Sequence, residues 1–449
     1  MIDSAEIDRA TEELHVHTSN VQRDYVFGWL LCGIYCESNL RDWLVLKGGN
    51  CLRKCYFPFG RFSSDLDFSS AAEVPSDWLT AELNRVCEFV HRSAGIDFDT
   101  SRTFCRPKRG ADDELQIVEA RVYFRSFYGE ESSMTISVRM DVTEWDRLYL
   151  PVQTRHLIHA YSDQPSCEAA IRCVKLEEQL ASKMKCLLQR RHVADLFDLA
   201  YTSVIHPEIE LDRRELVTTF LHKTIFSGSP GFVKGLFVDL PLGTFQGLWS
   251  KYIVCPVRTM LDFGSAAAAF QKLIADLFAN IAVNQRPVQF FPSSLRNPIM
   301  EAGHSLTLLE VVYDGRSRTV EPYSLTYKRR QDGVAREYFY VYDRTGGSSG
   351  PGVKCFVPDK VKSIRNTSEV FEPRFPVELR KAGEIVGSVD FEGSRRGGYG
   401  LSRSAEYPYR VECSVCGKQF RRKRPYQTRL NPHSDGYGNR CLGRIGYAL

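Results

Sequence analysis

Two aspartates, Asp65 and Asp67, are separated by one residue in the segment RFSSDLDFSS, where polar and apolar residues alternate. In an extended strand, residues i and i+2 point to the same side, so both carboxylates are predicted to project together while Leu66 is buried opposite. Two like charges held this close are unfavourable unless a cation lies between them. Mg²⁺ or Mn²⁺ accepts such carboxylates together with substrate phosphates. The pattern therefore predicts a divalent-metal site that handles phosphate groups.

A third carboxylate, Asp141, lies in the segment SVRMDVTEW. Its neighbours Met140 and Val142 are predicted to face the opposite side of a strand, and a charge in such a strand needs a partner or a metal. Three acids on adjacent strands could hold two metal ions, one activating the attacking oxygen and one steadying a leaving pyrophosphate.

A glycine pair, Gly48 and Gly49, follows the short apolar run WLVL and Lys47. Glycine lets backbone amides approach phosphate oxygens closely, so this turn is a candidate phosphate cradle. We include Lys47, Arg53 and Ser64 among the candidate nucleotide-binding residues. The structural alternative makes Asp65 a turn residue and Asp67 a solvated strand residue, but a glycine pair, a D-x-D and a distant third aspartate together favour a site.

A second group of charged residues lies in the helical segment EEQLASKMKCLLQRRHVADLFDL. Lys183 and Arg190 are seven residues apart, which is two helical turns, so they share one face. Such cations could neutralise charge that develops on a transferred phosphoryl group. A solvated helix face is the alternative interpretation.

Together these motifs resemble the nucleotidyltransferase superfamily and, more closely, the AbiEii/AbiGii toxin family over about residues 21–201. The most specific segments are RDYVFGWLL, LKGGNCLRK, RFSSDLDFS and the helical segment above. The resemblance implies NTP as substrate, Mg²⁺ as cofactor, Lys183 and Arg190 near the phosphates, and Asp195 and Asp198 as the family's closing D-x-x-D. Ala194 stands where the family often has an arginine. A toxin or anti-phage role, a cognate antitoxin or defence-system partner, and RNA such as a tRNA 3′ end as acceptor are also implied.

The elements that must position these residues follow from hydrophobic periodicity. Residues 1–46 are predicted to be helical, with the strand WLVLK at their end, and a further helix is predicted in WLTAELNRVCEFVHRSAG. Residues 116–127 and 134–143 alternate apolar and polar positions, which predicts a strand hairpin. A long helical stretch is expected over 168–200, broken near Arg191, and helices continue over 205–285. The predicted fold class is α+β, a mixed sheet with helices followed by a helical middle region.

Near Pro298 the sequence changes from helical patterns to predicted strands that are rich in Tyr, Val and Thr. Four strands are predicted, in SLTLLEVVYD, TVEPYSLTYKRR, REYFYVYDRT and VKCFVPDKVKSI. This segment resembles a WYL domain, a small Sm-like β-barrel, with YFYVYD in place of the W-Y-L run. The resemblance implies binding of nucleotides or nucleic acid, and a plain structural barrel is the alternative. Its basic and aromatic candidates are Tyr327, Arg329, Arg336 and Lys354.

Four residues near the C-terminus have metal-ligand spacing. Cys413, Cys416, His433 and Cys441 form a C-x2-C-x16-H-x7-C set. Four such ligands suit tetrahedral Zn²⁺ and leave no protein position open, so a structural zinc is predicted. The enclosed segment FRRKRPYQTRL is basic with interleaved aromatics, which indicates contact with RNA or DNA through residues such as Arg421, Arg422 and Arg424.

Length and composition limit the class of protein to which the chain can belong. The chain has 449 residues, of which 43% are hydrophobic, and no apolar run approaches the length needed to span a bilayer. We therefore predict a cytoplasmic protein without a membrane partner. Most of the 14 cysteines, such as Cys32, Cys36 and Cys186, are interpreted as small buried hydrophobes. From Glu378 onward basic residues outnumber acidic ones by 14 to 7, which is a modest pointer to nucleic acid.

The predicted organisation has a catalytic domain over 1–200 and a helical region over 201–296 that completes its cleft. A WYL-like barrel over 297–376, a linker over 377–406 and a zinc-binding basic tail over 407–449 follow. The predicted activity is metal-dependent nucleotide transfer from NTP to an acceptor. Two alternatives stay open at this point: a nucleotide or nucleic-acid sensor with an inactive fold, and nucleotidylation or phosphorylation of a protein.

Overall fold

The computed structural model describes residues 2–108, 117–127, 135–206, 209–224, 226–282, 289–329, 335–375 and 377–379, and within the tail 409–413, 419–422, 430, 433–434, 440–441 and 446–448. The chain divides into one compact unit over 1–386 and a second over 387–449. Each unit is described by itself.

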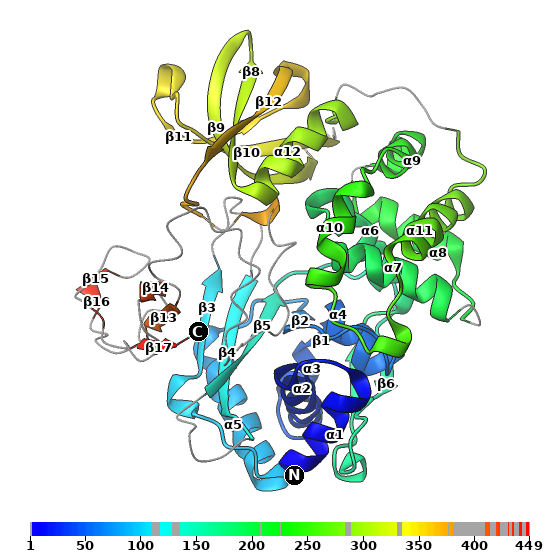
Figure 1. Cartoon of the computed structure of the whole chain (residues 1–449), viewed down its shortest axis with the longest axis vertical. Coiled ribbons are helices and arrows are strands. Elements are labelled where there is room, and N and C mark those ends of the chain that lie inside the picture. The colour runs from blue at the N-terminus through cyan, green and yellow to red at the C-terminus, as the bar shows by residue number, and fades with distance from the viewer. Residues whose placement is uncertain are drawn as a thin grey trace. The chain divides into compact units, whose positions relative to one another are not determined.

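The first unit is built on a mixed seven-stranded sheet, with the order β3-β4-β5-β2-β1-β7-β6 (Figure 1). Strands β2 and β5 are parallel, as are β1 and β7, and the other neighbours are antiparallel. The strands are β1 (Val45–Lys47), β2 (Asp65–Ser69), β3 (Phe104–Lys108), β4 (Ile117–Arg125), β5 (Thr135–Thr143), β6 (Gln153–His156) and β7 (Ala170–Cys173).

One face of this sheet packs against helices. Leu66, Phe68, Met140 and Val142 are buried in the core that the sheet shares with α2 (Thr18–Cys36) and α5 (Ser76–Ala94). The short helices α1 (Ser4–Leu14) and α3 (Leu40–Trp43) lie nearby (Figure 1). Because side chains alternate along a strand, the residues between these apolar positions project from the opposite face.

A helical region follows the sheet. It consists of α6 (Leu176–Arg190), α7 (Val193–Ile205), α8 (Arg213–Lys223), α9 (Pro230–Val238), α10 (Gly243–Tyr252) and α11 (Phe263–Leu277). These helices bury a second apolar core that includes Phe220, Phe237 and Trp249. The predicted break near Arg191 is confirmed, because Arg191 adopts a left-handed conformation with φ of 51° and ends α6.

A five-stranded antiparallel sheet with the order β11-β10-β9-β8-β12 follows α12 (Ser293–Ser305). Its strands are β8 (Thr307–Tyr313), β9 (Arg316–Arg329), β10 (Ala335–Asp343), β11 (Gly352–Phe356) and β12 (Val361–Val370). The prediction of one strand in VKCFVPDKVKSI is wrong, because a 3₁₀ turn at Pro358–Lys360 divides it into two. In the part of the chain that the structure describes, no strand ladder joins β11 to β12.

The second unit contains β13 (Tyr409–Cys413), β14 (Gln419–Arg422) and β17 (Gly446–Ala448), in the order β14-β13-β17. Strands β15 (His433–Ser434) and β16 (Arg440–Cys441) form a separate pair.

The strand pair over 116–127 and 134–143 is confirmed as β4 and β5. The prediction that 168–200 is helical throughout is wrong at its start, where β7 forms, because pairing with Leu46 of β1 overrides local preference. Cys32 is buried as expected, but Cys36 is exposed. Within the described residues, no helix is long and apolar enough to cross a membrane.

Candidate active site

The structure brings the three predicted aspartates together on the face of the sheet opposite α2 and α5. In the strand register, Asp67 lies beside Asp141 of β5 on one side and beside Lys47 of β1 on the other. Asp65 lies two residues before Asp67, on the same face. The parallel pairing of β2 with β5 therefore places two distant sequence segments side by side at one site.

Basic residues hold two of these carboxylates. Asp65 forms an ion pair with Arg139 of β5, and the Ser63 hydroxyl lies 3.3 Å from its Oδ1. Lys108 Nζ lies 3.0 Å from Asp141 Oδ2. Within the described part of the chain, Asp67 makes no hydrogen bond or ion pair, so its charge is balanced only by more distant groups.

These surroundings shift the pKa values of the two aspartates of β2 in opposite directions. Burial raises the pKa of Asp67, and the negative charges of Asp65 and Asp141 raise it further, to about 6. Burial also raises the pKa of Asp65, but the guanidinium of Arg139 outweighs it and holds that pKa below its ordinary value. Asp67 is therefore the aspartate of this pair whose negative charge is less well compensated.

The carboxylates fit a divalent cation with a preference for oxygen ligands. Asp141 Oδ1 is buried and makes no hydrogen bond, so one lone-pair direction faces no donor. Asp65 Oδ2 is paired with Arg139 and Asp141 Oδ2 with Lys108, so each of these two oxygens already faces a positive charge. The oxygens of the three carboxylates do not all lie within 4.8 Å of one another.

The glycine turn lies directly against Asp67. Helix α4 (Gly48–Cys51) begins where β1 ends, and Gly48 has φ of 75°. A Cβ added to Gly48 would lie 2.1 Å from Asp67 Oδ2, so only glycine fits. The Gln179 side chain accepts from the Gly48 N–H at 3.2 Å and donates to the Gly48 carbonyl at 2.9 Å. This amide holds the turn open beside the carboxylate.

We expect Gly48→Ala to abolish any activity of the site and to cost about 1–3 kcal/mol of stability, from left-handed strain and the clash with Asp67. Gly315→Ala is the matched control, because Gly315 has the same φ of 75° but open space around its Cβ position. Chemical denaturation and nucleotide-transfer assays of both variants measure the effect. Equal stability loss in the two variants would show that contact with Asp67 adds nothing.

The helical residues form a buried charge network beside this turn. Lys183 Nζ lies 3.1 Å from Asp195 Oδ1 and 2.8 Å from Asp198 Oδ2. Arg190 Nε lies 3.0 Å from Asp195 Oδ2, and its side chain is 31% exposed. Arg61 binds both Asp198 oxygens, at 2.8 and 2.9 Å. Lys183 and Arg190 therefore share a partner, as their shared helix face predicts, and the solvated-face alternative is wrong for Lys183, which is buried.

Other predicted nucleotide-binding residues are placed less directly. Lys47 donates to Thr143 and to Asp146. Arg53 is buried, with Nε 2.7 Å from Asp24 and Nη1 on the Gly60 carbonyl, so its donors support the chain fold. Ser64 precedes β2, and it is the neighbouring Ser63 whose hydroxyl approaches Asp65.

Sequence reasoning missed several residues of this site. Arg139 could have been found, because it lies two positions before Asp141 and must share its face. Arg61 lies in the RFSSDLDFS segment, but its partner Asp198 is 137 residues away. Lys108 belongs to β3, which was not predicted. Arg23 of α2 is buried, its Nε makes no hydrogen bond, and the charge of Asp65 opposes the lowering of its pKa by burial.

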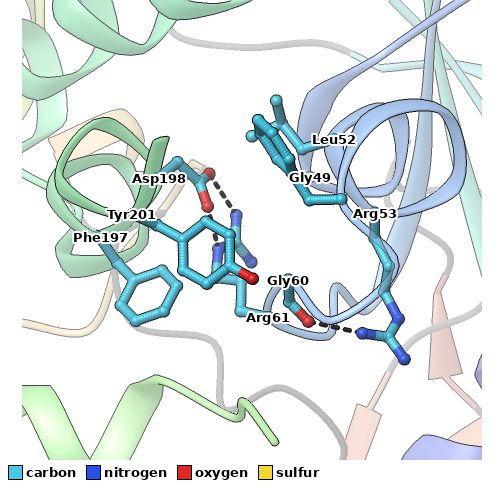
Figure 2. A pocket seen from close by; sticks show the side chains of 9 residues that line it. Gly49, Leu52, Arg53, Gly60, Arg61, Phe197, Asp198 and Tyr201 are labelled. Atoms are coloured by element: carbon cyan, nitrogen blue, oxygen red, sulfur yellow. Dashed lines mark hydrogen bonds and ion pairs between the residues drawn. The ribbon is translucent and has the colours of Figure 1, made fainter. Parts of the chain in front are cut away.

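A small cavity lies behind the glycine turn, between Gly49, Arg61, Asp198 and Tyr201 (Figure 2). Its volume of about 10 Å³ corresponds to one water molecule and excludes a nucleobase. The buried Tyr201 hydroxyl makes no hydrogen bond and points into this region beside the Arg61–Asp198 pair (Figure 2). The cavity therefore fits a bridging water.

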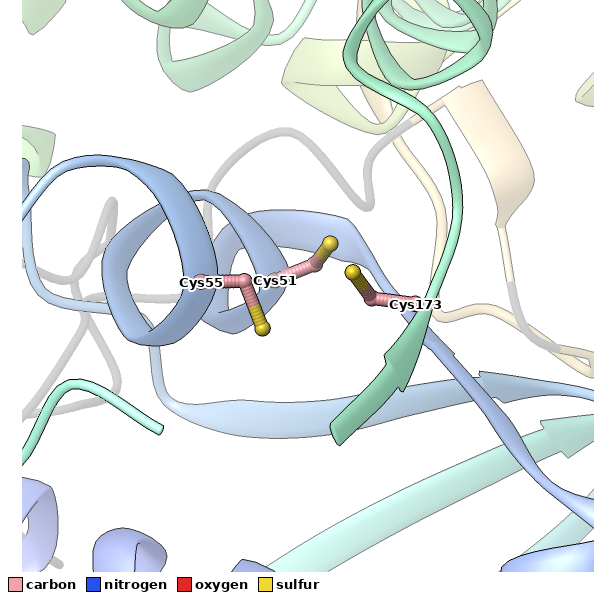
Figure 3. A group of neighbouring side chains, drawn as sticks. All are labelled: Cys51, Cys55 and Cys173. Carbon is pink, nitrogen blue, oxygen red and sulfur yellow. The ribbon is translucent and has the colours of Figure 1, made fainter. Parts of the chain in front are cut away.

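Three buried thiols lie beneath the turn: Cys51, Cys55 and Cys173 (Figure 3). Their Sγ atoms lie within 4.8 Å of one another, which could suit a soft metal ion. Burial raises the pKa of the Cys51 thiol, and all three side chains belong to the apolar core of the sheet. Hydrogen bonds from the Cys51 and Cys55 thiols lower the pKa of Cys173 to about 4, so the cluster favours one thiolate held by two thiols.

In the five-stranded sheet, the register places Arg336 beside Lys328, between the positions of Tyr327 and Arg329. Arg336 lies 3.5 Å from Asp359, whereas Lys354, across from Val341, binds Asp343 at 2.9 Å and the Gly346 carbonyl. The side chains of Tyr327 and Arg329 lie outside the described residues.

In the tail, β15 and β16 place His433 opposite Cys441. Cys413 ends β13, and Arg421 and Arg422 belong to β14. Their side chains, and all of Cys416 and Arg424, lie outside the described residues, so the zinc set stays a prediction.

Comparison with known proteins gives three findings. A family model described as the nucleotidyl transferase AbiEii toxin of type IV toxin–antitoxin systems matches residues 29–323. One similar solved structure is MenT4, a nucleotidyltransferase toxin from Mycobacterium tuberculosis H37Rv, with 20% identity, a TM-score of 0.37, and coverage of 62% of this chain and 89% of that one. No curated protein matches. Because the family model spans well over half of the chain and includes the D-x-D strand, the third aspartate and the charged helix pair, the protein belongs to the AbiEii family of nucleotidyltransferase toxins.

Proposed function

We propose that this chain transfers a nucleotidyl group from an NTP to an acceptor, with Mg²⁺ or Mn²⁺ held by Asp65, Asp67 and Asp141. The observation that carries the proposal is the strand register, which aligns Asp67 with Asp141, while Asp67 itself lies against the turn at Gly48. The metal would activate the attacking oxygen and neutralise the leaving pyrophosphate. Family membership supports the same reaction class.

The protein residues around the carboxylates have distinct tasks in this proposal. Gly48 and Gly49 allow the backbone to approach the triphosphate, since a side chain at either position would meet Asp67 or Ser63. Arg190 is the partly exposed cation of the helix pair, so it is the better candidate for direct phosphate contact. Lys183 is buried and positions Asp195 and Asp198, which in turn fix Arg190 and Arg61.

We further propose RNA, such as a tRNA 3′ end, as the acceptor, and a cognate antitoxin as the partner that controls the toxin. The family description supports the toxin–antitoxin assignment. The decisive experiment incubates the chain with each α-³²P-labelled NTP, Mg²⁺, total RNA and total protein. Label on RNA supports the proposal. Label on protein would instead support protein nucleotidylation, and label on protein in a parallel incubation with γ-³²P-labelled NTP would support a kinase.

An inactive sensor is the remaining alternative, and it predicts nucleotide binding without transfer of label to any acceptor. Asp67 argues against it, because this half-buried carboxylate lies between Asp65 and Asp141 with no bonded cation of its own among the described residues, which is unfavourable in a fold that has no use for a metal ion.

The two C-terminal modules are proposed to recognise nucleic acid or a nucleotide-like ligand. For the sheet over 297–376, the proposal is a WYL-like barrel that binds through residues such as Arg336. For the tail, the proposal is a basic nucleic-acid-binding segment that folds around a zinc ion, with Cys413, Cys416, His433 and Cys441 as ligands.

We expect Cys416→Ser to lose one zinc per chain and to unfold the tail locally, because metal binding supplies most of the folding energy of so small a segment. Elemental analysis of the purified chain and limited proteolysis measure both effects. Cys186→Ser, in α6, is the matched control. Absence of zinc in the unaltered protein would contradict the prediction.

A further inference from the structure

Three cysteines meet beneath the glycine turn, and no part of the proposed transfer reaction uses them. Cys51 and Cys55 lie four residues apart on one continuous helical segment, so their side chains share a face of it. Cys173 comes from strand β7, whose register places it beside Leu46 of β1. Figure 3 shows the three side chains, two from the helical segment and one from the strand. We call these three residues the thiol cluster, and it joins two segments that are far apart in the sequence.

The spacing of the sulfur atoms fits a single metal ion. All three Sγ atoms lie within 4.8 Å of one another. With metal–sulfur bonds of about 2.3 Å, the sulfur atoms around a three-coordinate ion are about 4 Å apart, so small changes in side-chain torsion are enough to close the site. The backbone therefore already holds the three ligands at the distance that one ion requires.

The thiol cluster is closed to bulk water but lies near the surface. Its three side chains are 2% exposed or less. Cys173 pairs with Gln153 of β6, the edge strand of the sheet. The exposed side chain of Arg155 donates to the Cys55 carbonyl at 2.7 Å and lies over the ring of Tyr56, 4.3 Å from its centre. An ion would reach the thiols past these two side chains and, once bound, would be shielded from water.

The surroundings favour a negatively charged sulfur at this point. Hydrogen bonds from the thiols of Cys51 and Cys55 lower the pKa of Cys173, and the charge of Arg155 adds to this lowering. The thiolate, not the thiol, is the form of cysteine that binds metal. In the same core, Cys87 packs as an ordinary apolar side chain, and burial is the main cause that raises its pKa. The thiol cluster thus differs from a cysteine that only fills space.

The helical segment is distorted where it carries the thiol cluster. Helix α4 continues into a π-helical turn over Leu52–Tyr56, and the Phe57 N–H donates to the Leu52 carbonyl at 2.7 Å. Such widened turns are rare and are frequent at functional sites. This one begins directly after Cys51 and contains Cys55, so its geometry sets the spacing of the two sulfur atoms.

The ligand set selects the kind of metal. Sulfur ligands favour soft ions such as Cu(I) and Zn²⁺ over Mg²⁺, which prefers oxygen. Structural Zn²⁺ takes four ligands in a tetrahedron, and within the part of the chain that the structure describes the thiol cluster offers three. Cu(I) is satisfied by two or three sulfur ligands. Its single positive charge is balanced by one thiolate, which leaves no net charge in the apolar core.

We propose that the thiol cluster is a buried binding site for Cu(I), independent of nucleotide transfer. Binding forms copper–sulfur bonds and releases to solvent the protons of the thiols that ionise, and the oxidation state of copper does not change. Because α4 begins at Gly48, the bound ion would also fasten the glycine turn to β7.

The test counts tightly bound Cu(I) in the reduced full chain. Cu(I) is titrated without oxygen against the chromophoric chelator bathocuproine disulfonate. Other thiols of the chain also bind Cu(I), so the measured quantity is the difference between variants. Cys51→Ala/Cys173→Ala should bind one equivalent fewer than the unaltered chain. The control Cys87→Ala/Cys186→Ala removes two thiols outside the cluster and should keep that equivalent.

A single substitution and a stability measurement keep the result interpretable if the double variant fails to fold. Cys55→Ala leaves two ligands and should weaken this equivalent by about tenfold or more, since even the loss of a residue that supports a ligand costs about 10–100-fold in metal affinity. One equivalent of Cu(I) should raise the midpoint of thermal unfolding in the unaltered chain and in the control, because a ligand that binds only the folded state stabilises it. It should not do so in Cys51→Ala/Cys173→Ala.

Equal numbers of Cu(I) equivalents in the unaltered chain and in the cluster variants would overturn the proposal, as would loss of the same equivalent in the control. If Zn²⁺ fills the cluster-dependent equivalent in preference to Cu(I), the assignment to Cu(I) is wrong. If the chain transfers no nucleotide but the cluster-dependent equivalent is present, the proposed function fails and this site stands.

Discussion

Replacing Asp67 by asparagine is expected to abolish nucleotide transfer and, at the same time, to stabilise the fold above pH 6. The loss of transfer should be about 10²–10³-fold or more, because the central carboxylate of the trio is removed from the developing charge. The gain in stability follows from the surroundings of Asp67, which is crowded by Asp65 and Asp141 and has no bonded partner of its own among the described residues.

The pH dependence has a definite sign. The pKa of Asp67 is raised to about 6 in the fold, so the folded state holds a proton that the unfolded state releases near its ordinary value of about 4. Stability of the metal-free protein therefore falls as pH rises from about 4 to about 6, and stays lower above that. Asp67→Asn should remove this fall and gain about 1–3 kcal/mol at pH 7 to 8.

Asp65→Asn provides a control with the opposite sign. Arg139 holds the pKa of Asp65 below its ordinary value, so ionised Asp65 stabilises the fold, and this contribution is lost as pH falls. Both variants should lose transfer, but Asp65→Asn should be less stable than the unaltered chain at pH 7. Urea unfolding with EDTA at pH 4.5 and 7.5 measures the difference. Lower stability of Asp67→Asn at pH 7.5, or full transfer activity, would contradict the assignment of Asp67.

Local pattern was sufficient for the centre of the site. Alternation placed Asp65 and Asp67 on one face and buried Leu66, and the same rule separated Asp141 from Met140 and Val142. What alternation could not provide was strand order. β5 pairs in parallel with β2 across some 70 intervening residues, and only that pairing makes Asp141 a neighbour of Asp67.

Long-range ion pairs set the limit of sequence reasoning in this chain. Arg53 follows the glycine pair closely, which favoured a role in nucleotide binding, but its guanidinium meets Asp24, 29 residues earlier. Arg61 meets Asp198 across 137 residues. Neither pairing leaves a spacing signal, since both depend on how α2 and α7 pack around the turn. The short strands β3, β6 and β7 were missed for the same reason: partner strands, not their own residues, define them.

Lys183→Met is expected to destabilise the fold by about 3–5 kcal/mol, a larger effect than that of any single substitution at Arg190. The Lys183 side chain is 8% exposed, and its partners Asp195 and Asp198 are 1% and 4% exposed. Burial lowers the pKa of Lys183, but the charges of Asp198 and Asp195 outweigh it and keep the pKa above its ordinary value. Removing the ammonium leaves two buried carboxylates with Arg190 and Arg61 as their cations.

Arg190→Met separates structural from substrate roles, because Arg190 bonds the same Asp195 from a partly exposed position. It should cost about 1 kcal/mol of stability or less, but lower transfer by about tenfold or more if Arg190 contacts a phosphate. The double variant Lys183→Met/Asp195→Asn also removes the carboxylate that Lys183 and Arg190 share, and a double-mutant cycle in urea measures the coupling between Lys183 and Asp195. Suppose that Lys183→Met unfolds at the same urea concentration as the unaltered chain but has lost transfer. The ion pairs of Lys183 with Asp195 and Asp198 then do not stabilise the fold. Its charge would then act on the nucleotide itself, as the shared helix face alone suggests.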